Sequence, residues 1–350
     1  MTEAPLLTFV LLLLALVAWM AIPLAPAIRE LIAPRDAAPL EAVGNDAGNL
    51  TYFAESFTNR AMREGLLGTM VPPRLMDGTP VRAHTAGLPL VRQKEPIEEV
   101  VVFMDSTPVP DGITLTSETL ARLTLRGGRN VTYRALLGQR DVDLGEGTTV
   151  LRWVHARGLL RVGDRSRLFG RATADREIIL GDAIDFDRLE ATVVRVSEAE
   201  TPEPAVAPTA EYEVFQFPPD TIELGPRYWK TERDLLLPPY SALLGTAITT
   251  GSIVINAGAR VAGSLKAHGE IIVRGGAIVQ GSITAWDRII IESGARVSGP
   301  VISEKLIEVQ AAIVGGATRR TTVTAPIIHL YPGATIYGAV MAGDEGRTRS

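Results

Sequence analysis

The clearest pattern in this sequence is a repeat of apolar residues and glycines every 18 positions in its C-terminal part. Within the repeat, runs such as Ile271-x-Val273 and Ile289-x-Ile291 alternate in the way that a strand with one buried face alternates. Self-similarity at a fixed period decides the fold before any local preference does. The columns in register are Gly245, Gly263, Gly281 and Gly299, then Ile253, Ile271, Ile289 and Ile307, and then Val261, Val279 and Val297.

A repeat of this length predicts a β-solenoid in which each repeat forms one coil. Eighteen residues divide into three faces of about six, and coils stacked about 4.8 Å apart pair every strand with the coils above and below. Gly-Ala pairs at 276–277 and 294–295 fit the turns between strands. The isoleucine and valine columns then become ladders inside the coil, and these seven residues are the predicted solenoid core.

The same period occurs earlier in the chain. Gly145, Gly163 and Gly181 are 18 apart, and no proline occurs between residues 112 and 196. We therefore predict an all-β protein with two solenoid blocks, at 98–196 and 240–342. Residues 197–239 hold eight of the 23 prolines and read as a Pro-rich linker, whose aromatic second half is expected to pack on a coil, and residues 343–350 read as a polar tail.

The N-terminus is a different kind of sequence. Residues 4–28 carry no charge, which is long enough for one helix to cross a bilayer. We predict a transmembrane anchor over 1–28, and the residues expected to anchor it are Leu6, Phe9, Leu12, Leu16, Trp19 and Ile22. The competing interpretation is a cleaved signal peptide with a cleavage site near Ala25-Pro26-Ala27, but the preceding tail carries Glu3 and no basic residue. Arg29 and Arg35 follow the span, so the positive-inside rule predicts a cytoplasmic body.

Residues 29–97 form a juxtamembrane segment and linker. Leu50, Phe53, Phe57 and Ala61 recur at helical spacing, so 49–66 is predicted to be a short amphipathic helix. Its apolar stripe is suited to packing on the following domain or, alternatively, to lying on the membrane surface. The five prolines between 67 and 97 favour a linker there.

The amino-acid composition limits the partners and the kinds of active site that this chain can have. The chain of 350 residues has a net charge of −5, which argues against nucleic acid as a partner. It has no Cys, which excludes disulfides, Cys-ligated zinc and thiol nucleophiles, and it has only four His. His268 and His329 are the only two in the second block, and they occupy different columns of the repeat. We therefore expect no catalytic residue, no metal site and no cofactor.

The repeat of Ile-x-Val, Gly-Ala-x-Val and Gly-Ser-Leu type, here 271–283 and 289–301, resembles that of the bactofilins. These are bacterial polymer-forming cytoskeletal proteins. The resemblance covers about 240–342, with a weaker echo over 98–196. It implies a right-handed β-solenoid that assembles end to end without nucleotide, at the bacterial inner membrane. The chain is longer than a typical member, has two blocks and carries an insertion in its last coil.

The sequence thus predicts a membrane-anchored, non-enzymatic scaffold whose partners are membrane lipid and copies of itself. One alternative is an accessory docking protein of an envelope or polysaccharide synthesis system, with envelope-synthesis proteins as partners. Another is a solenoid acyltransferase. Self-association is expected at the last coil, because only a short polar tail follows it and an open solenoid end exposes unpaired backbone groups. The residues predicted for that contact are Leu330, Tyr331, Ile336, Tyr337 and Val340.

Overall fold

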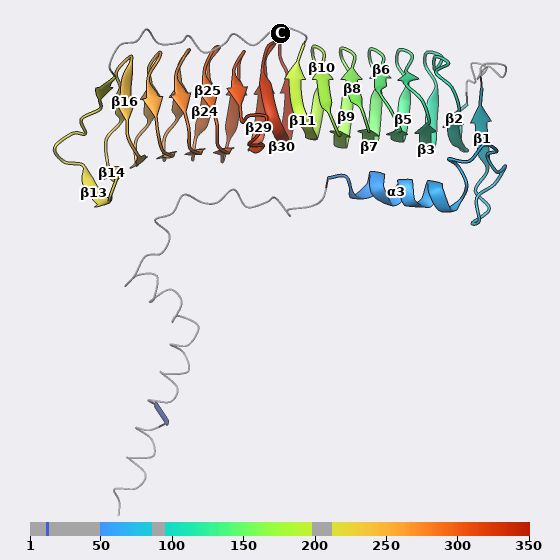
Figure 1. The fold of residues 1–350 in the computed structure, drawn as a ribbon, viewed down its shortest axis with the longest axis horizontal. Coiled ribbons are helices and arrows are strands. Elements are labelled where there is room, and N and C mark those ends of the chain that lie inside the picture. Colours follow the sequence, from blue (N-terminus) through green and yellow to red (C-terminus); the bar gives the residue numbers. More distant parts are fainter. Residues whose placement is uncertain (1–11, 14–49, 86–94, 198–211) are drawn as a thin grey trace, which may run out of the picture. The chain divides into compact units, whose positions relative to one another are not determined.

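The structure is a computed structural model, and it describes residues 12–13, 50–85, 95–197 and 212–350. The chain divides into two compact units, 1–43 and 44–350. The second unit is a β-solenoid of about 14 turns, and the 30 strands among the described residues belong to one sheet (Figure 1). The predicted all-β solenoid fold is confirmed for this unit.

The first block comprises strands β1 to β11 and consists of parallel ladders. Its long strands turn a corner of the coil, and irregularities in the register mark that corner in the β3–β5 and β5–β7 pairs. Its short strands form a separate face, on which β4, β6, β8 and β10 pair in order. The strands are β1 (Val81–His84), β2 (Val100–Phe103), β3 (Thr114–Ala121), β4 (Leu125–Arg126), β5 (Thr132–Gly138), β6 (Val142–Leu144), β7 (Thr149–Ala156), β8 (Leu159–Val162), β9 (Arg167–Ala174), β10 (Glu177–Leu180) and β11 (Asp185–Val196).

The second block comprises β12 to β30 and has three short strands in each regular coil. Every third strand pairs in parallel, as β18 pairs with β21 and β21 with β24. The strands are β12 (Glu213–Val214), β13 (Ile222–Gly225), β14 (Tyr228–Thr231), β15 (Leu235–Leu237), β16 (Ser241–Leu243), β17 (Thr246–Thr249), β18 (Ile253–Ile255), β19 (Arg260–Val261), β20 (Leu265–Ala267), β21 (Ile271–Val273), β22 (Ile278–Val279), β23 (Ile283–Ala285), β24 (Arg288–Ile291), β25 (Arg296–Val297), β26 (Val301–Ser303), β27 (Leu306–Val309), β28 (Ile313–Val314), β29 (Thr321–Leu330) and β30 (Thr335–Thr348).

Residues that are 18 positions apart in the sequence repeat pair directly with each other in neighbouring coils of the structure. Neighbouring coils pair Ile253 with Ile271, Ile271 with Ile289, and Ile289 with Ile307. These four residues and the column of Val261, Val279 and Val297 are all fully buried. The glycine column is required by close approach of the coils, because a Cβ added to Gly281 would lie 2.3 Å from the carbonyl oxygen of Gly263.

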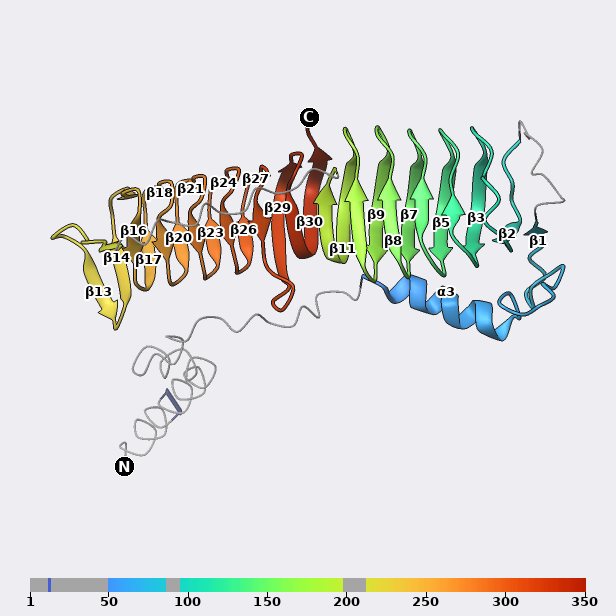
Figure 2. The same ribbon diagram turned by 45° about the horizontal axis from the view of Figure 1, so that its top comes forward.

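The two blocks join into one continuous stack. Strand β11 ends the first block and pairs in antiparallel fashion with β30, which ends the second block. The two strands lie side by side in both views (Figures 1 and 2). We call this junction the seam. The two blocks therefore meet at their C-terminal coils, and the chain begins each block at an outer end of the stack.

One amphipathic helix, α3 (Tyr52–Arg63), lies along the outside of the first block (Figure 1). Its buried Phe57 and Ala61 pack with Leu120, Leu137 and Trp153, which point outward from the coils. The predicted helix is thus present, and it packs on the following domain. Phe53 was predicted to share the buried stripe but is exposed, and the guanidinium carbon of Arg171 lies 5.0 Å from the centre of its ring.

Three predicted boundaries are wrong. Strand β1 lies inside the predicted linker 29–97, and β12 to β15 lie inside the predicted linker 197–239. The predicted polar tail 343–350 belongs largely to β30, because the seam offers those residues strand partners.

The predicted anchor lies outside the described residues, except for Leu12 and its neighbour Leu13, which are helical. In the part of the chain that the structure describes, no helix is both long enough and apolar enough to cross a membrane.

Candidate functional site

The last coil of the second block, predicted to be an open end, is covered by the first block. Leu330, Ile336 and Val340 are fully buried, and Tyr331 and Tyr337 are partly buried. Val340 lies opposite Leu189 of β11, and Ile336 lies opposite Val194. The expectation that this coil exposes unpaired strand edges is therefore wrong. The first block supplies the strand and the apolar side chains that the expectation assigned to a second copy.

Hydrogen bonds close the seam at its edges. The Thr348 hydroxyl donates to the carbonyl oxygen of Gly181 at 2.9 Å and accepts from the backbone N–H of Ile184 at 2.8 Å. At the other edge, the N–H of Val196 donates to the carbonyl oxygen of Ala334 at 3.1 Å. Thr348 is almost completely buried, so it belongs to the seam rather than to a solvated tail.

A second polar group at the seam is Glu190 of β11. Burial raises the pKa of the Glu190 carboxyl, and Arg320 of the second block opposes that shift. Arg320 also donates a hydrogen bond of 2.7 Å to the hydroxyl of Thr192. The pair Arg319-Arg320 therefore contacts the other block through its second member.

The opposite end of the second block is open. We call it the outer end of the second block, formed by β12, β13, β14 and β15. In the described parts of the chain, no strand pairs with the outer edges of β12, β13 or β15. Large apolar side chains are exposed here, and they are Val214, Ile222, Leu224, Tyr228, Leu236, Tyr240 and Leu244.

An aromatic cluster lies beneath these exposed residues. The rings of Phe217 and Trp229 are stacked with centres 4.5 Å apart, and Phe215 meets Phe217 edge to face at 5.1 Å. All three rings are partly buried and pack against the solenoid core. This confirms that the aromatic half of the predicted linker packs on a coil, and the cluster closes the interior while leaving the strand edges outside it.

The outer end of the first block is different. Its outermost strand, β1, places Arg82 and His84 in register with the core residues Val101 and Phe103 of β2. Arg82 donates a hydrogen bond of 2.8 Å to the Glu99 carboxylate, and the ring centre of His84 lies 5.2 Å from that of Phe103. A charged residue and an imidazole thus occupy positions at this end that aliphatic or aromatic residues occupy in the next coil. Polar residues at the terminal coil of a solenoid prevent it from stacking on another end.

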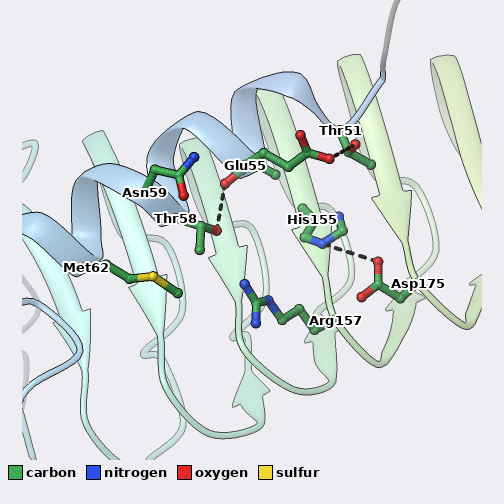
Figure 3. A pocket seen from close by; sticks show the side chains of 9 residues that line it. Thr51, Glu55, Thr58, Asn59, Met62, His155, Arg157 and Asp175 are labelled. Atoms are coloured by element: carbon green, nitrogen blue, oxygen red, sulfur yellow. Dashed lines mark hydrogen bonds and ion pairs between the residues drawn. The ribbon is translucent and has the colours of Figure 1, made fainter.

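A polar cleft of about 510 Å³ lies between α3 and the first block (Figure 3). His155 is buried at its base, and the His155 Nδ1 atom is 2.8 Å from the hydroxyl of Thr173. The His155 Nε2 atom is 3.6 Å from the Asp175 carboxylate. Burial lowers the pKa of His155, and the Asp175 carboxylate opposes that shift.

An imidazole beside a carboxylate is the arrangement of a general base. The hydroxyl that it contacts here belongs to Thr173, which is buried beneath it. The hydroxyl of Thr58 in the cleft donates to the backbone of its own helix, at the carbonyl oxygen of Ala54. We interpret the cleft as the polar end of the contact between α3 and the first block. His155 is not among the residues predicted from the sequence, although its column changes from Leu120 and Leu137 to histidine.

The two histidines considered in the sequence, His268 and His329, lie in the second block, whereas the cleft lies at the first block. The ring of His268 stacks on that of Trp286, with centres 6.0 Å apart. His329 points outward between the carboxylates of Glu308, at 3.7 Å, and Glu345, at 3.5 Å. His268 and His329 are not brought together, and the described residues contain no group of three or more His, Asp or Glu that could hold a metal ion.

Comparison with known proteins gives no further guide, since no family model, no curated protein and no solved structure matches this chain.

Proposed function

We propose that this protein is a membrane-anchored, non-enzymatic β-solenoid scaffold that associates with copies of itself, as the bactofilins that its sequence resembles do. The observation that carries the proposal is the single apolar core that runs through both blocks and across the seam. Such a stack is rigid along its length, because each coil is hydrogen-bonded to the next. One of its outer ends has open strand edges and exposed apolar side chains, which is the chemistry of a contact rather than of a solvated cap.

In this proposal, residues 1–28 hold the protein in the bacterial inner membrane and the solenoid lies in the cytoplasm. The test is fractionation of cells that express the full chain. Wild-type protein is expected in the membrane pellet and to resist extraction with high salt. The double variant Leu12→Lys/Leu16→Lys is expected in the soluble fraction, while Leu236→Lys, on the solenoid surface, stays with the membrane. Membrane retention of the double variant overturns the anchor.

Self-association is tested separately by light scattering on the full chain in mild detergent. A molar mass above that of one chain, rising with concentration to a plateau or beyond, supports the proposal. A single chain at every concentration overturns it.

A second function, docking of envelope-synthesis proteins, is favoured by one surface feature. Leu236, Val254, Ile272 and Ile290 point outward from successive coils and form an aliphatic stripe on one face of the second block. The ion pair of Glu270 with Arg288, at 2.6 Å, lies along one side of it. An apolar stripe with a polar rim is typical of a protein contact.

The docking function predicts that the double variant Ile272→Lys/Ile290→Lys reproduces the cellular defect caused by loss of the protein. Thr284→Lys, on a neighbouring face of the same coils, is the matched control and is expected to behave as wild type. Normal growth of cells with the double variant contradicts the docking function and leaves the self-associating scaffold.

A further inference from the structure

Two solenoid ends could contact each other at three places in this stack, and the structure differs at each of them. The two C-terminal coils cover each other at the seam. The outer end of the first block carries Arg82 and His84 in its core columns, with the Arg82 guanidinium bound to Glu99. Among the described residues, the outer end of the second block is the one end that combines unpaired strand edges with exposed apolar residues.

We propose that two copies of this chain join through the outer ends of their second blocks, about a two-fold axis, and form a closed dimer. The inference rests on the proposed self-association and names its surface and its stoichiometry. A two-fold contact uses the same surface on both partners, so it terminates after one pairing. An open filament needs a second, complementary end, and in the part of the chain that the structure describes the seam and the polar cap leave none.

The alternative of stacking this end onto the outer end of the first block is disfavoured by its chemistry. That contact would bury Arg82 and Glu99 against Ile222, Leu224 and Leu236. Burying charged and polar groups without new hydrogen-bond partners is costly. Joining the outer ends of two second blocks brings together mainly the exposed apolar side chains of β13 and β15.

The seam shows the geometry that such a contact would take. There, two solenoid ends of the same chain face each other, and their strands pair in antiparallel fashion on successive sides of the coil. Two copies of the outer end of the second block, facing each other, would also run antiparallel. Strand β13 (Ile222–Gly225) is the outermost strand, and among the described residues it pairs on one side alone, with β14.

A two-fold axis places one residue of β13 opposite itself, and Leu224 suits that position. Glu223 would face its own charge in the second copy, which destabilises a strand pair. With Leu224 on the axis, this register places Glu223 of one copy opposite Gly225 of the other, so the two Glu223 carboxylates do not face each other. It also gathers Leu224 and Ile222 of both copies on one face of the joined strands.

The absence of native cysteine allows a direct test on the full chain in mild detergent. In the variant Leu224→Cys, where the native side chain is 52% exposed, oxidation is expected to link two chains efficiently, since a residue on the axis meets its own copy within disulfide reach. The matched control is Met76→Cys, with a native side chain 87% exposed in the segment before β1, and it is expected to stay unlinked. Light scattering is expected to give twice the mass of one chain.

Substitution of the contact provides the second arm. Ile222→Arg/Leu224→Arg is expected to give the mass of one chain with the solenoid still folded, because both side chains are exposed. A dimer that persists in this variant, or a dimer whose Leu224→Cys form does not cross-link, overturns the surface but leaves self-association. A continuous series of larger species overturns the closed dimer. A monomeric wild type overturns both this inference and the proposed self-association.

Discussion

Asp185 and Arg347 lie opposite each other in the antiparallel pair of β11 and β30, and the Asp185 Oδ1 and Arg347 Nε atoms are 3.1 Å apart. Arg167, on the neighbouring coil of the first block, approaches the other oxygen of the same carboxylate at 3.9 Å. A ladder of side chains that begins inside one block is therefore continued by the other. The seam is matched in charge as well as in backbone pairing.

This ion pair is expected to add little stability. Both side chains are more than a third exposed, so water and salt screen their attraction. Asp185→Asn is predicted to lower the free energy of unfolding by less than about 1 kcal/mol, and the loss is predicted to shrink at high salt. Urea denaturation at low and high sodium chloride measures it. The control is Asp143→Asn, which breaks a pair with Arg161 inside the first block. A larger, salt-independent loss for Asp185→Asn contradicts the prediction.

The buried part of the seam is expected to matter more. Leu189 and Val340 lie opposite each other and are both fully buried. Leu189→Ala removes apolar contacts and leaves a cavity, so we predict a loss of about 2–5 kcal/mol in the free energy of unfolding. The same measurement on Leu123→Ala, at a position 38% exposed, is predicted to change little. Equal losses in the two variants would mean that the blocks do not meet at β11 and β30.

The repeat was sufficient to predict the interior of each block, because Ile271 and Ile289 occupy the same column only if their coils are stacked in register. The seam was not predictable in the same way. Leu189 and Val340 look like ordinary inward residues of their own blocks, and nothing repeated in the sequence relates them. The missing partner strand was therefore assigned to a second copy.

Shorter signals failed for local reasons. The strand Val81–His84 has only four residues and lies among prolines, so its pairing with β2 was not visible as alternation. His155 is one of four histidines in the sequence, but its role could not be inferred from the sequence. Its role depends on where α3 crosses the coils, which the helical spacing of Phe57 and Ala61 does not reveal.

The glycine column gives a sharp test of the coil spacing. An alanine Cβ at position 281 would meet backbone atoms of Gly263 and Ser264 within 2.6 Å, so the coils must separate to accept it. Gly281→Ala is predicted to cost about 1–3 kcal/mol of stability, as overpacking does. Gly316→Ala is the control, because a Cβ there meets nothing within 4 Å. Thermal melts of the two variants that coincide would show that the coils are not so closely spaced.

Tyr133 is an unusual core residue. It is fully buried, and its hydroxyl has no hydrogen-bond partner among the residues that the structure describes. Burial raises the pKa of the Tyr133 phenol, so the folded state keeps its proton at a pH where the unfolded chain loses it. Stability is therefore predicted to fall above about pH 10, the ordinary pKa of tyrosine.

Tyr133→Phe removes the unpaired hydroxyl and keeps the ring. Its free energy of unfolding at pH 7 is predicted to equal or exceed that of wild type by up to about 1 kcal/mol, and its loss of stability above pH 10 is predicted to be smaller. Tyr133→Ala, which removes the ring, is predicted to cost about 3–5 kcal/mol. Urea denaturation at pH 7 and pH 10.5 distinguishes these outcomes. A destabilised Tyr133→Phe would mean that the hydroxyl has a partner.

His155 should make the contact between α3 and the first block sensitive to acid. Because burial lowers its pKa below the ordinary value of 6.5, the unfolded chain binds a proton at a pH where the folded protein does not. The stability associated with neutral His155 is thus present above pH 6.5 and is lost as the pH falls below it. The groups that act on His155 are Asp175 and Glu55, which favour its charged form, and Arg157, which opposes it.

The prediction is a lower melting temperature at pH 5.5 than at pH 7.5, with a smaller difference in His155→Gln, which has no proton to gain. Burial also lowers the pKa of His84, so part of the difference is expected to remain in that variant. The double variant His84→Gln/His155→Gln is expected to reduce it further. His268→Gln provides the control, since its ring stacks on the exposed Trp286 outside both contacts. If His155→Gln keeps the full difference between the two pH values, His155 is not the group that responds, and the cleft contributes nothing to the acid sensitivity of the fold.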